Sequence, residues 1–200
     1  MEYSESKLNT EYFRREESSE VKLLNVDFKY KKSDNYIFKN LNLTFAKDSH
    51  TLIVGANGTG KSTLLGLIGN VLIPENGNLI SFSDNFSYIG ATPFIFQKSL
   101  RENILYGNKF NVTDAEIMNM LEMFDIFKEK SSYDLSRNVD SSSLSSGQMQ
   151  KIGFIRALLS KPDILLLDES MANLDDNSQI IVLDQIAKQN ITVINSTHDP

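Results

Sequence analysis

The stretch that decides the fold is residues 55–62, Gly-Ala-Asn-Gly-Thr-Gly-Lys-Ser, which fits the pattern G-x-x-x-x-G-K-[ST]. The apolar run "HTLIV" precedes it, and "TLLGLIGNVL" follows it as a helix would. Glycines let the backbone curl until successive N–H groups face inward and bind an anion, and the next helix points its positive dipole end there. The stretch predicts a phosphate-binding loop whose residues contact a nucleotide: Gly55, Asn57, Gly58, Gly60, Lys61, Ser62 and Thr63.

Two side chains of this loop have chemistry of their own. Lys61 can reach the β- and γ-phosphates of a nucleotide, and the Ser62 hydroxyl can ligate Mg²⁺. A glycine-rich structural turn is the alternative interpretation. The position between a strand and a helix favours phosphate binding.

The stretch "ILLLDE" at 164–169 is an apolar segment that ends in two carboxylates. Asp168, at the carboxyl end of the expected strand, can hold Mg²⁺ directly or through water. Side chains alternate along a strand, so we expect Glu169 to point to the opposite side, where it would act as a general base on the attacking water. Many buried strands end in Asp or Glu as helix caps, but the phosphate loop upstream favours the catalytic interpretation.

Composition limits the other kinds of site. The 200 residues are 40% hydrophobic, enough for one domain with a core. The absence of cysteine and the presence of only two histidines exclude disulfide scaffolds and histidine-rich metal centres. A formal net charge of −6 argues against nucleic-acid partners, and no apolar run approaches the roughly 20 residues of a membrane span. The charged residues 1–20 predict a polar leader before a soluble cytoplasmic domain.

The order of the expected elements predicts the fold class. Strands are expected over 21–30, 37–47, 50–54, 78–82, 86–91, 163–170 and 191–197, and helices over 63–72, 117–124, 145–160 and 177–189. The stretch Thr113-Asp114-Ala115-Glu116 forms a capping box before the second of these helices. Alternating strands and helices predict an α/β fold with a mostly parallel sheet, and the two middle helices predict a separate lobe.

The stretch "SLSSGQ" at 143–148 stands before the helical segment "MQKIGFIRALLS". Serine and glycine are ordinary helix-start residues. Together with "GANGTGKST", "ILLLDES", "ANLD" and "STHD", in this order along the chain, the stretch resembles the nucleotide-binding domain of ABC transporters over residues 21–200. The segment "SLRENILYG" at 99–107 is similar to that of exporters.

This resemblance implies a P-loop NTPase (RecA-like) core with an N-terminal antiparallel β subdomain and an inserted α-helical subdomain. It places the ATP-binding core at 21–97 and 161–200, and the helical subdomain at 98–160. The family pattern continues beyond His198, so we expect the core to be truncated at its carboxyl end.

In the family, two such domains pair head to tail, and each ATP lies between one loop and the other subunit's signature helix. The resemblance therefore implies that Ser145 offers a hydroxyl and Gly147 allows close backbone approach, while the helix N-terminus attracts the γ-phosphate. Gln148 also follows the family pattern.

Three further positions take roles from the resemblance. Tyr30 matches the aromatic residue that stacks on adenine, although a strand aromatic packed in the core is the alternative. Asp175 matches the aspartate that contacts the partner across the dimer. His198 matches the histidine that contacts the γ-phosphate, although a lone histidine after a strand is often structural.

The sequence departs from the family pattern at two site positions. Ala91 stands where a glutamine normally helps to bind Mg²⁺ and the attacking water, and Gln97 lies about six residues too late to replace it. Ser146 stands where the signature normally has glycine, and its side chain could crowd the phosphate or add a hydroxyl donor.

The leading hypothesis is an ATP-binding and ATP-hydrolysing domain of an ABC exporter at the cytoplasmic face of the membrane. Its partners would be a second nucleotide-binding domain, identical or homologous, and a transmembrane domain. Ala91 and Ser146 motivate an alternative, a nucleotide-gated interaction module with little or no hydrolysis. A non-transport ABC ATPase is the third hypothesis. It is disfavoured because neither tandem ATP domains nor a long coiled coil is visible.

Overall fold

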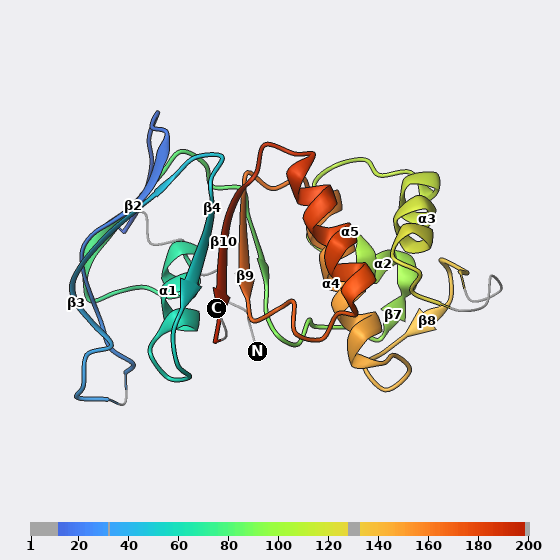
Figure 1. Cartoon of the computed structure of the whole chain (residues 1–200), viewed down its shortest axis with the longest axis horizontal. Helices are drawn as coiled ribbons and strands as arrows, with labels where there is room; N and C mark the ends of the chain where they lie inside the picture. Colours follow the sequence, from blue (N-terminus) through green and yellow to red (C-terminus); the bar gives the residue numbers. More distant parts are fainter. Residues whose placement is uncertain (1–11, 32, 128–132, 199–200) are drawn as a thin grey trace, which may run out of the picture.

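Figure 1 shows three zones along the long axis: a mostly antiparallel sheet, a parallel sheet and a group of helices. The computed structural model describes residues 12–31, 33–127 and 133–198. Sheets with parallel and antiparallel strands, together with helices, confirm the α/β class.

The antiparallel zone is a sheet with the strand order β1-β5-β2-β3. Its strands are β1 (Phe13–Arg15), β2 (Glu20–Phe28), β3 (Phe38–Ala46) and β5 (Asn76–Ser81). β2 runs antiparallel to both β3 and β5, in agreement with the N-terminal antiparallel β subdomain that the resemblance implies. The register shifts between Leu23 and Val26, where Asn25 has a positive φ of 51°. In a regular strand, Leu23 and Val26 would point to opposite faces, because they are three positions apart. The irregularity lets both side chains be buried.

The described part of residues 1–20 corrects the prediction that this segment is only a polar leader. Phe13–Arg15 forms β1, which pairs in parallel with β5. Tyr12 is 3% exposed, and its hydroxyl donates to the Leu67 carbonyl oxygen at 3.3 Å. A three-residue strand at a sheet edge exposes most of its side chains, so its composition resembles that of a linker. Residues 1–11 lie outside the described residues.

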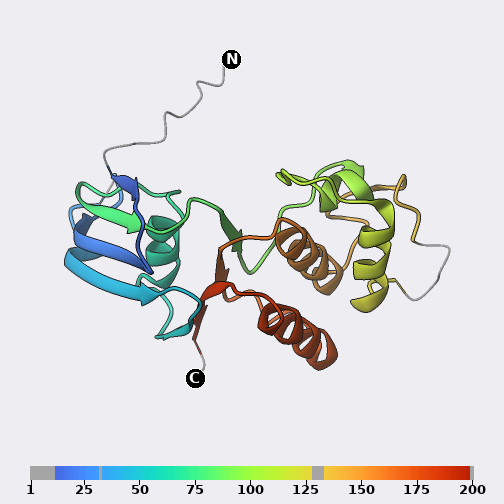
Figure 2. The same cartoon turned by 90° about the horizontal axis from the view of Figure 1, so that it is seen from above.

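The central sheet has the strand order β4-β10-β9-β6, and every pair in it is parallel. Its strands are β4 (His50–Val54), β6 (Phe86–Ile89), β9 (Ile164–Asp168) and β10 (Thr192–Thr197). All residues of β9 are buried, as expected for a strand covered on both faces. Figure 2 shows α1 on one side of this sheet and α4 and α5 on the other.

Five helices complete the described structure: α1 (Lys61–Ile68), α2 (Leu100–Ile104), α3 (Asp114–Met123), α4 (Ser146–Leu159) and α5 (Asp176–Ala187). Capping boxes start α2, α3 and α4, and the one at Thr113 confirms the sequence prediction. The short helix α2 was not predicted. β7 (Lys98–Ser99) and β8 (Asn138–Val139) pair as a two-stranded antiparallel sheet beside it.

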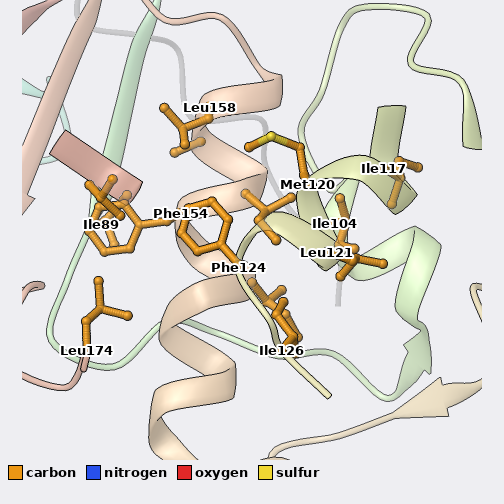
Figure 3. Close-up of a cluster of buried hydrophobic side chains, with 14 of the residues drawn as sticks. Ile89, Ile104, Ile117, Met120, Leu121, Phe124, Ile126, Phe154, Leu158 and Leu174 are labelled. Atoms are coloured by element: carbon orange, nitrogen blue, oxygen red, sulfur yellow. The ribbon is translucent and has the colours of Figure 1, made fainter. Parts of the chain in front are cut away.

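Within the described residues, the core consists of two hydrophobic clusters that meet at β9. Leu165 and Leu167 belong to the cluster with α4 and the other helices, whereas Ile164 and Leu166 belong to the cluster with α1 and the antiparallel sheet. Figure 3 shows side chains of the first cluster on both sides of α4, with residues of α2 and α3 on one side and Ile89 and Leu174 on the other. Since this cluster also includes residues of the parallel sheet, the boundaries at 98 and 160 stay a prediction.

No helix within residues 12–31, 33–127 and 133–198 combines the length and the apolar character needed to cross a membrane.

Candidate nucleotide-binding site

The loop between β4 and α1 has the conformation that an anion-binding turn requires. Gly58 and Gly60 have φ values of 81° and 98°, in the region that favours glycine. Gly60 is the N-cap of α1 and has no side-chain cap, so the first N–H groups of α1 remain directed at the loop. A Cβ on Gly60 would lie 2.9 Å from Cγ2 of Ile37.

Lys61 places a buried positive charge inside this loop. Its Nζ donates to the carbonyl oxygens of Gly55 at 2.7 Å and Ala56 at 3.2 Å. The same Nζ lies 3.4 Å from Oε1 of Glu169. The lysine is therefore fixed where negative charge from a bound phosphate would meet it.

Glu169 does not continue β9, which corrects the expectation that it points away from Asp168. Its φ is 50°, and its N–H donates to the Ser196 carbonyl oxygen at 3.1 Å, so the alternation of a strand stops at Asp168. As a result, Asp168 and Glu169 line the same cavity.

Two hydroxyl groups hold the Asp168 carboxylate. Ser196 Oγ donates to Oδ1 at 2.7 Å, and the Tyr88 hydroxyl donates to Oδ2 at 2.7 Å. Burial, followed by the hydrogen bond to Asp168, raises the pKa of Tyr88, so this phenol remains a proton donor. Both hydrogen-bond donors are uncharged, so neither of them neutralises the negative charge of Asp168.

The loop and the carboxylates enclose a cavity of about 430 Å³. Its wall brings together most residues that the sequence nominates for nucleotide and metal: Tyr30, Asn57, Gly58, Gly60, Lys61, Ser62, Thr63, Asp168 and Glu169. Ala91, at the position of the missing glutamine, and Ile37, which sequence reasoning missed, also line it.

Tyr30 is at the cavity rim and not packed in the core, because it is 47% exposed. Its ring meets Phe28 edge to face, with a centroid distance of 5.1 Å. Its hydroxyl makes a hydrogen bond of 2.9 Å with Oγ1 of Thr63. The ring is held at the wall while part of its surface stays open, as a stacking platform requires.

His198 lies beside Glu169. Its Nδ1 is 4.0 Å from Oε2 of Glu169, and both residues line an adjoining cavity of about 240 Å³. The structure therefore brings His198 to the edge of the carboxylate site.

The signature residues lie elsewhere. Ser145, Gly147, Gln148 and Asp175 line a separate cavity of about 630 Å³, and none of these four described residues lines the loop cavity. Ser145 Oγ accepts from the Gln148 N–H at 3.2 Å, which leaves the serine hydroxyl proton free to donate outward.

Asp175 is fixed within this second cavity. It caps α5 by accepting from the Ser178 N–H at 2.9 Å and pairs with Lys151 Nζ at 3.0 Å. These contacts, the Ser178 hydrogen bond first, lower the pKa of Asp175 to about 2. Arg137 and Lys151 also line the cavity, together with the acidic side chains of Asp125 and Asp175. The Lys151 contact had no local sequence signal, because it joins two different helices.

The segment around Ala91 is held through its backbone. The Gly90 carbonyl oxygen accepts from Gln150 Nε2 at 3.2 Å, and the Ala91 carbonyl oxygen accepts from Asn173 Nδ2 at 3.0 Å. Gln97 is exposed and is not among the residues that line the loop cavity. The structure gives no support to Gln97 as a substitute for the missing glutamine.

Comparison with known proteins gives consistent matches. A family model described as ABC transporter matches residues 38–172. The chain is 34% identical over 195 residues to ABC transporter B family member 13 of Arabidopsis thaliana, covering 88% of this chain and 16% of that protein. It is 33% identical over 198 residues to the heterocyst differentiation ATP-binding protein HepA of Nostoc sp., covering 89% of this chain and 32% of that protein.

A solved structure described as a bacterial Atm1-family ABC exporter with ATP bound superposes with a TM-score of 0.77 and 25% sequence identity. The match covers 90% of this chain and 34% of that chain. This similarity bears out the predicted P-loop NTPase fold. The chain spans about a third or less of the length of these relatives.

Proposed function

The chain belongs to the ABC transporter family, and we propose that it is the ATP-binding and ATP-hydrolysing domain of an exporter. The observation that carries this proposal is the division of the predicted site between two separate cavities of one chain. One cavity has the phosphate loop and both carboxylates, and the other has the helix N-terminus of the signature. Neither surface alone encloses a triphosphate, but two copies facing head to tail would do so twice.

The residues of the loop cavity fit Mg²⁺ bound together with nucleotide. The Ser62 hydroxyl and the Asp168 carboxylate are hard oxygen donors in the wall of the same cavity. In the part of the chain that the structure describes, no group of three or more His, Cys, Asp or Glu residues could hold a metal by itself. Mg²⁺ commonly takes one or two protein ligands and completes its shell with phosphate oxygens and water. When bound, it would neutralise charge on the phosphates.

Lys61 and Glu169 would divide the remaining work. Lys61, held by the Gly55 and Ala56 carbonyl oxygens, would bind phosphate oxygens. A phosphate close to Lys61 would weaken its 3.4 Å contact with Glu169 and leave that carboxylate available to orient a water molecule. His198, 4.0 Å from Glu169, would contact the γ-phosphate from the same side.

The signature cavity would close on the partner's nucleotide. Ser145 would donate its hydroxyl, and the N-terminus of α4 would face the γ-phosphate. Each such contact contributes about 0.3–2 kcal/mol, so pairing needs several contacts and should weaken when the γ-phosphate leaves. ATP would therefore act as a switch for the association of two domains.

The transmembrane partner would dock at a groove of about 630 Å³ beside β6. Phe94, Tyr106 and Phe110 line it and are 69%, 58% and 49% exposed. Exposed aromatic side chains gathered at one hollow favour a protein interface. The greater length of the ABC relatives leaves room for a membrane-embedded domain, and this arrangement would put the chain at the cytoplasmic face.

A binding module with little hydrolysis is the second candidate. The observation that favours it is the place of Ala91, whose methyl side chain lines the loop cavity where a water-binding amide is expected. Ser146 adds an exposed side chain to the signature. Turnover equal to that of the Glu169→Gln variant, with nucleotide binding intact, would support this candidate.

The Glu169→Gln variant tests the leading proposal. It keeps the size of the side chain but removes the base, so we expect lost turnover, retained Mg-ATP binding and a dimer in size-exclusion chromatography only when Mg-ATP is present. Lys61→Ala in the same background is the matched control and should prevent both binding and pairing. A monomer with saturating Mg-ATP bound would contradict the head-to-tail model.

A further inference from the structure

The Asp168 carboxylate has two hydroxyl donors that the proposed function has not used. Each oxygen of this carboxylate accepts one hydroxyl proton, from Ser196 and from Tyr88, and both distances are 2.7 Å. Hydrogen bonds from O–H to an ionised carboxylate are short and strong. The torsion that turns an aspartate carboxylate is broad, so hydrogen-bond partners determine its orientation.

Tyr88 reaches Asp168 from the neighbouring strand. β6 and β9 are parallel, and Tyr88 is opposite Leu166, two residues before Asp168. The long phenol spans this offset, which the serine-sized side chain of Ser87 in the same strand could not do. The Tyr88 ring is 46% exposed and forms part of the groove beside β6, while its hydroxyl extends to the carboxylate of the nucleotide cavity.

The alanine at position 91 increases the importance of the Tyr88 hydroxyl for the carboxylate site. Three residues after Tyr88, Ala91 lines the loop cavity with a methyl group. Within the segment 88–91, the side chain that makes a polar contact with the carboxylate site is therefore Tyr88, through its hydroxyl group.

Resting on the proposed function, we propose that Tyr88 is a positioning residue that orients the Asp168 carboxylate for the divalent cation of bound nucleotide. Hydrogen bonds from the Tyr88 and Ser196 hydroxyl groups fix the orientation of the carboxylate plane. Neither donor adds a positive charge that would repel the cation. Without the Tyr88 hydroxyl, Oδ2 loses its donor and the carboxylate can rotate away.

The test separates binding of the cation from binding of nucleotide. Mn²⁺ serves as the probe and is followed by electron paramagnetic resonance, with the protein in excess over ATP so that little free ATP chelates the ion. Partners of a metal ligand typically contribute 10–100-fold to metal affinity, so we expect Tyr88→Phe to raise the Kd for Mn²⁺ by about 10-fold. The affinity for ATP in EDTA should change by less than about twofold, because the loop is untouched.

Tyr106→Phe is the matched control. Tyr106 lines the same groove, but its ring packs against Phe96 at 4.2 Å and the Arg156 guanidinium at 5.9 Å. This variant should leave the Kd for Mn²⁺ unchanged. Tyr88→Leu, which also lacks the hydroxyl, should repeat the shift of Tyr88→Phe if the phenylalanine variant folds poorly.

Two results would overturn the proposal. An unchanged Kd for Mn²⁺ in both Tyr88 variants would show that the hydrogen bond does not act on the cation. An equal loss of ATP affinity with and without the cation would show a merely structural role. Failure of the unchanged protein to bind ATP at all would instead contradict the proposed function, so the two failures are distinguishable.

Discussion

Replacing Gly60 by alanine tests whether the loop geometry described above is required. Gly60 has a φ of 98°, and a Cβ there would lie 2.9 Å from Cγ2 of Ile37 and 3.0 Å from Cζ of Phe38. Two penalties therefore add. The left-handed region destabilises a residue with a Cβ by about 1–2 kcal/mol, and overpacking adds about 1–3 kcal/mol. Because Ile37 is 37% exposed and can partly move aside, we expect a total of about 2–4 kcal/mol.

Urea unfolding with linear extrapolation measures this loss, provided that the slope with denaturant stays unchanged. Gly107→Ala is the matched control, because Gly107 has a φ of 74° but a Cβ there would have no heavy atom within 4 Å. It should lose only the backbone part, about 1–2 kcal/mol. Gly60→Ala should also weaken ATP binding, whereas Gly107→Ala should not. Equal destabilisation by the two variants would refute the crowding argument, and a neutral Gly60→Ala would refute the backbone argument too.

Two further predictions concern the signature side. Folding lowers the pKa of Asp175 from 3.8 to about 2, so its contribution to stability is present above pH 3.8 and lost as the pH falls towards 2. The difference in unfolding free energy between the unchanged protein and Asp175→Asn should shrink over that range, and a difference independent of pH would contradict the assignment. Ser145→Ala removes the N-cap of α4 and should reduce stability by about 1 kcal/mol. It should also abolish Mg-ATP-dependent pairing in the Glu169→Gln background, whereas dimers that persist would show that the hydroxyl does not contact the partner's nucleotide.

Those parts of the fold that depend on local pattern could be predicted from the sequence. The leucine run before Asp168 predicts a buried strand, and β9 is buried at every residue. The capping pattern at Thr113 predicts the start of α3, because both hydrogen bonds of the box join residues three apart. Two elements are too short for their sequences to show a recognisable pattern. β1 has three residues and α2 has five, fewer than the two turns needed to show helical periodicity.

The site could be predicted as a set of residues but not as a set of contacts. The motif around Lys61 identifies the loop, and the structure brings most of the nominated residues into one cavity. The contact between Tyr88 and Asp168 depends on the parallel register of two strands that are 80 residues apart in sequence. No local signal sets that register, because it results from packing of the whole sheet.

The backbone turn at Glu169 determines how the two carboxylates differ. Strand alternation would have placed the two side chains on opposite faces of the sheet. The φ of 50° at Glu169 instead leaves both at one cavity, and the residues that contact each carboxylate differ. Asp168 accepts from two neutral hydroxyls, which orient it and leave its charge for a cation. Glu169 lies 3.4 Å from the cationic Lys61, which already offsets its charge and makes it the weaker metal ligand. These contacts therefore support the proposed assignment of metal binding to Asp168 and of water activation to Glu169 once phosphate engages the lysine.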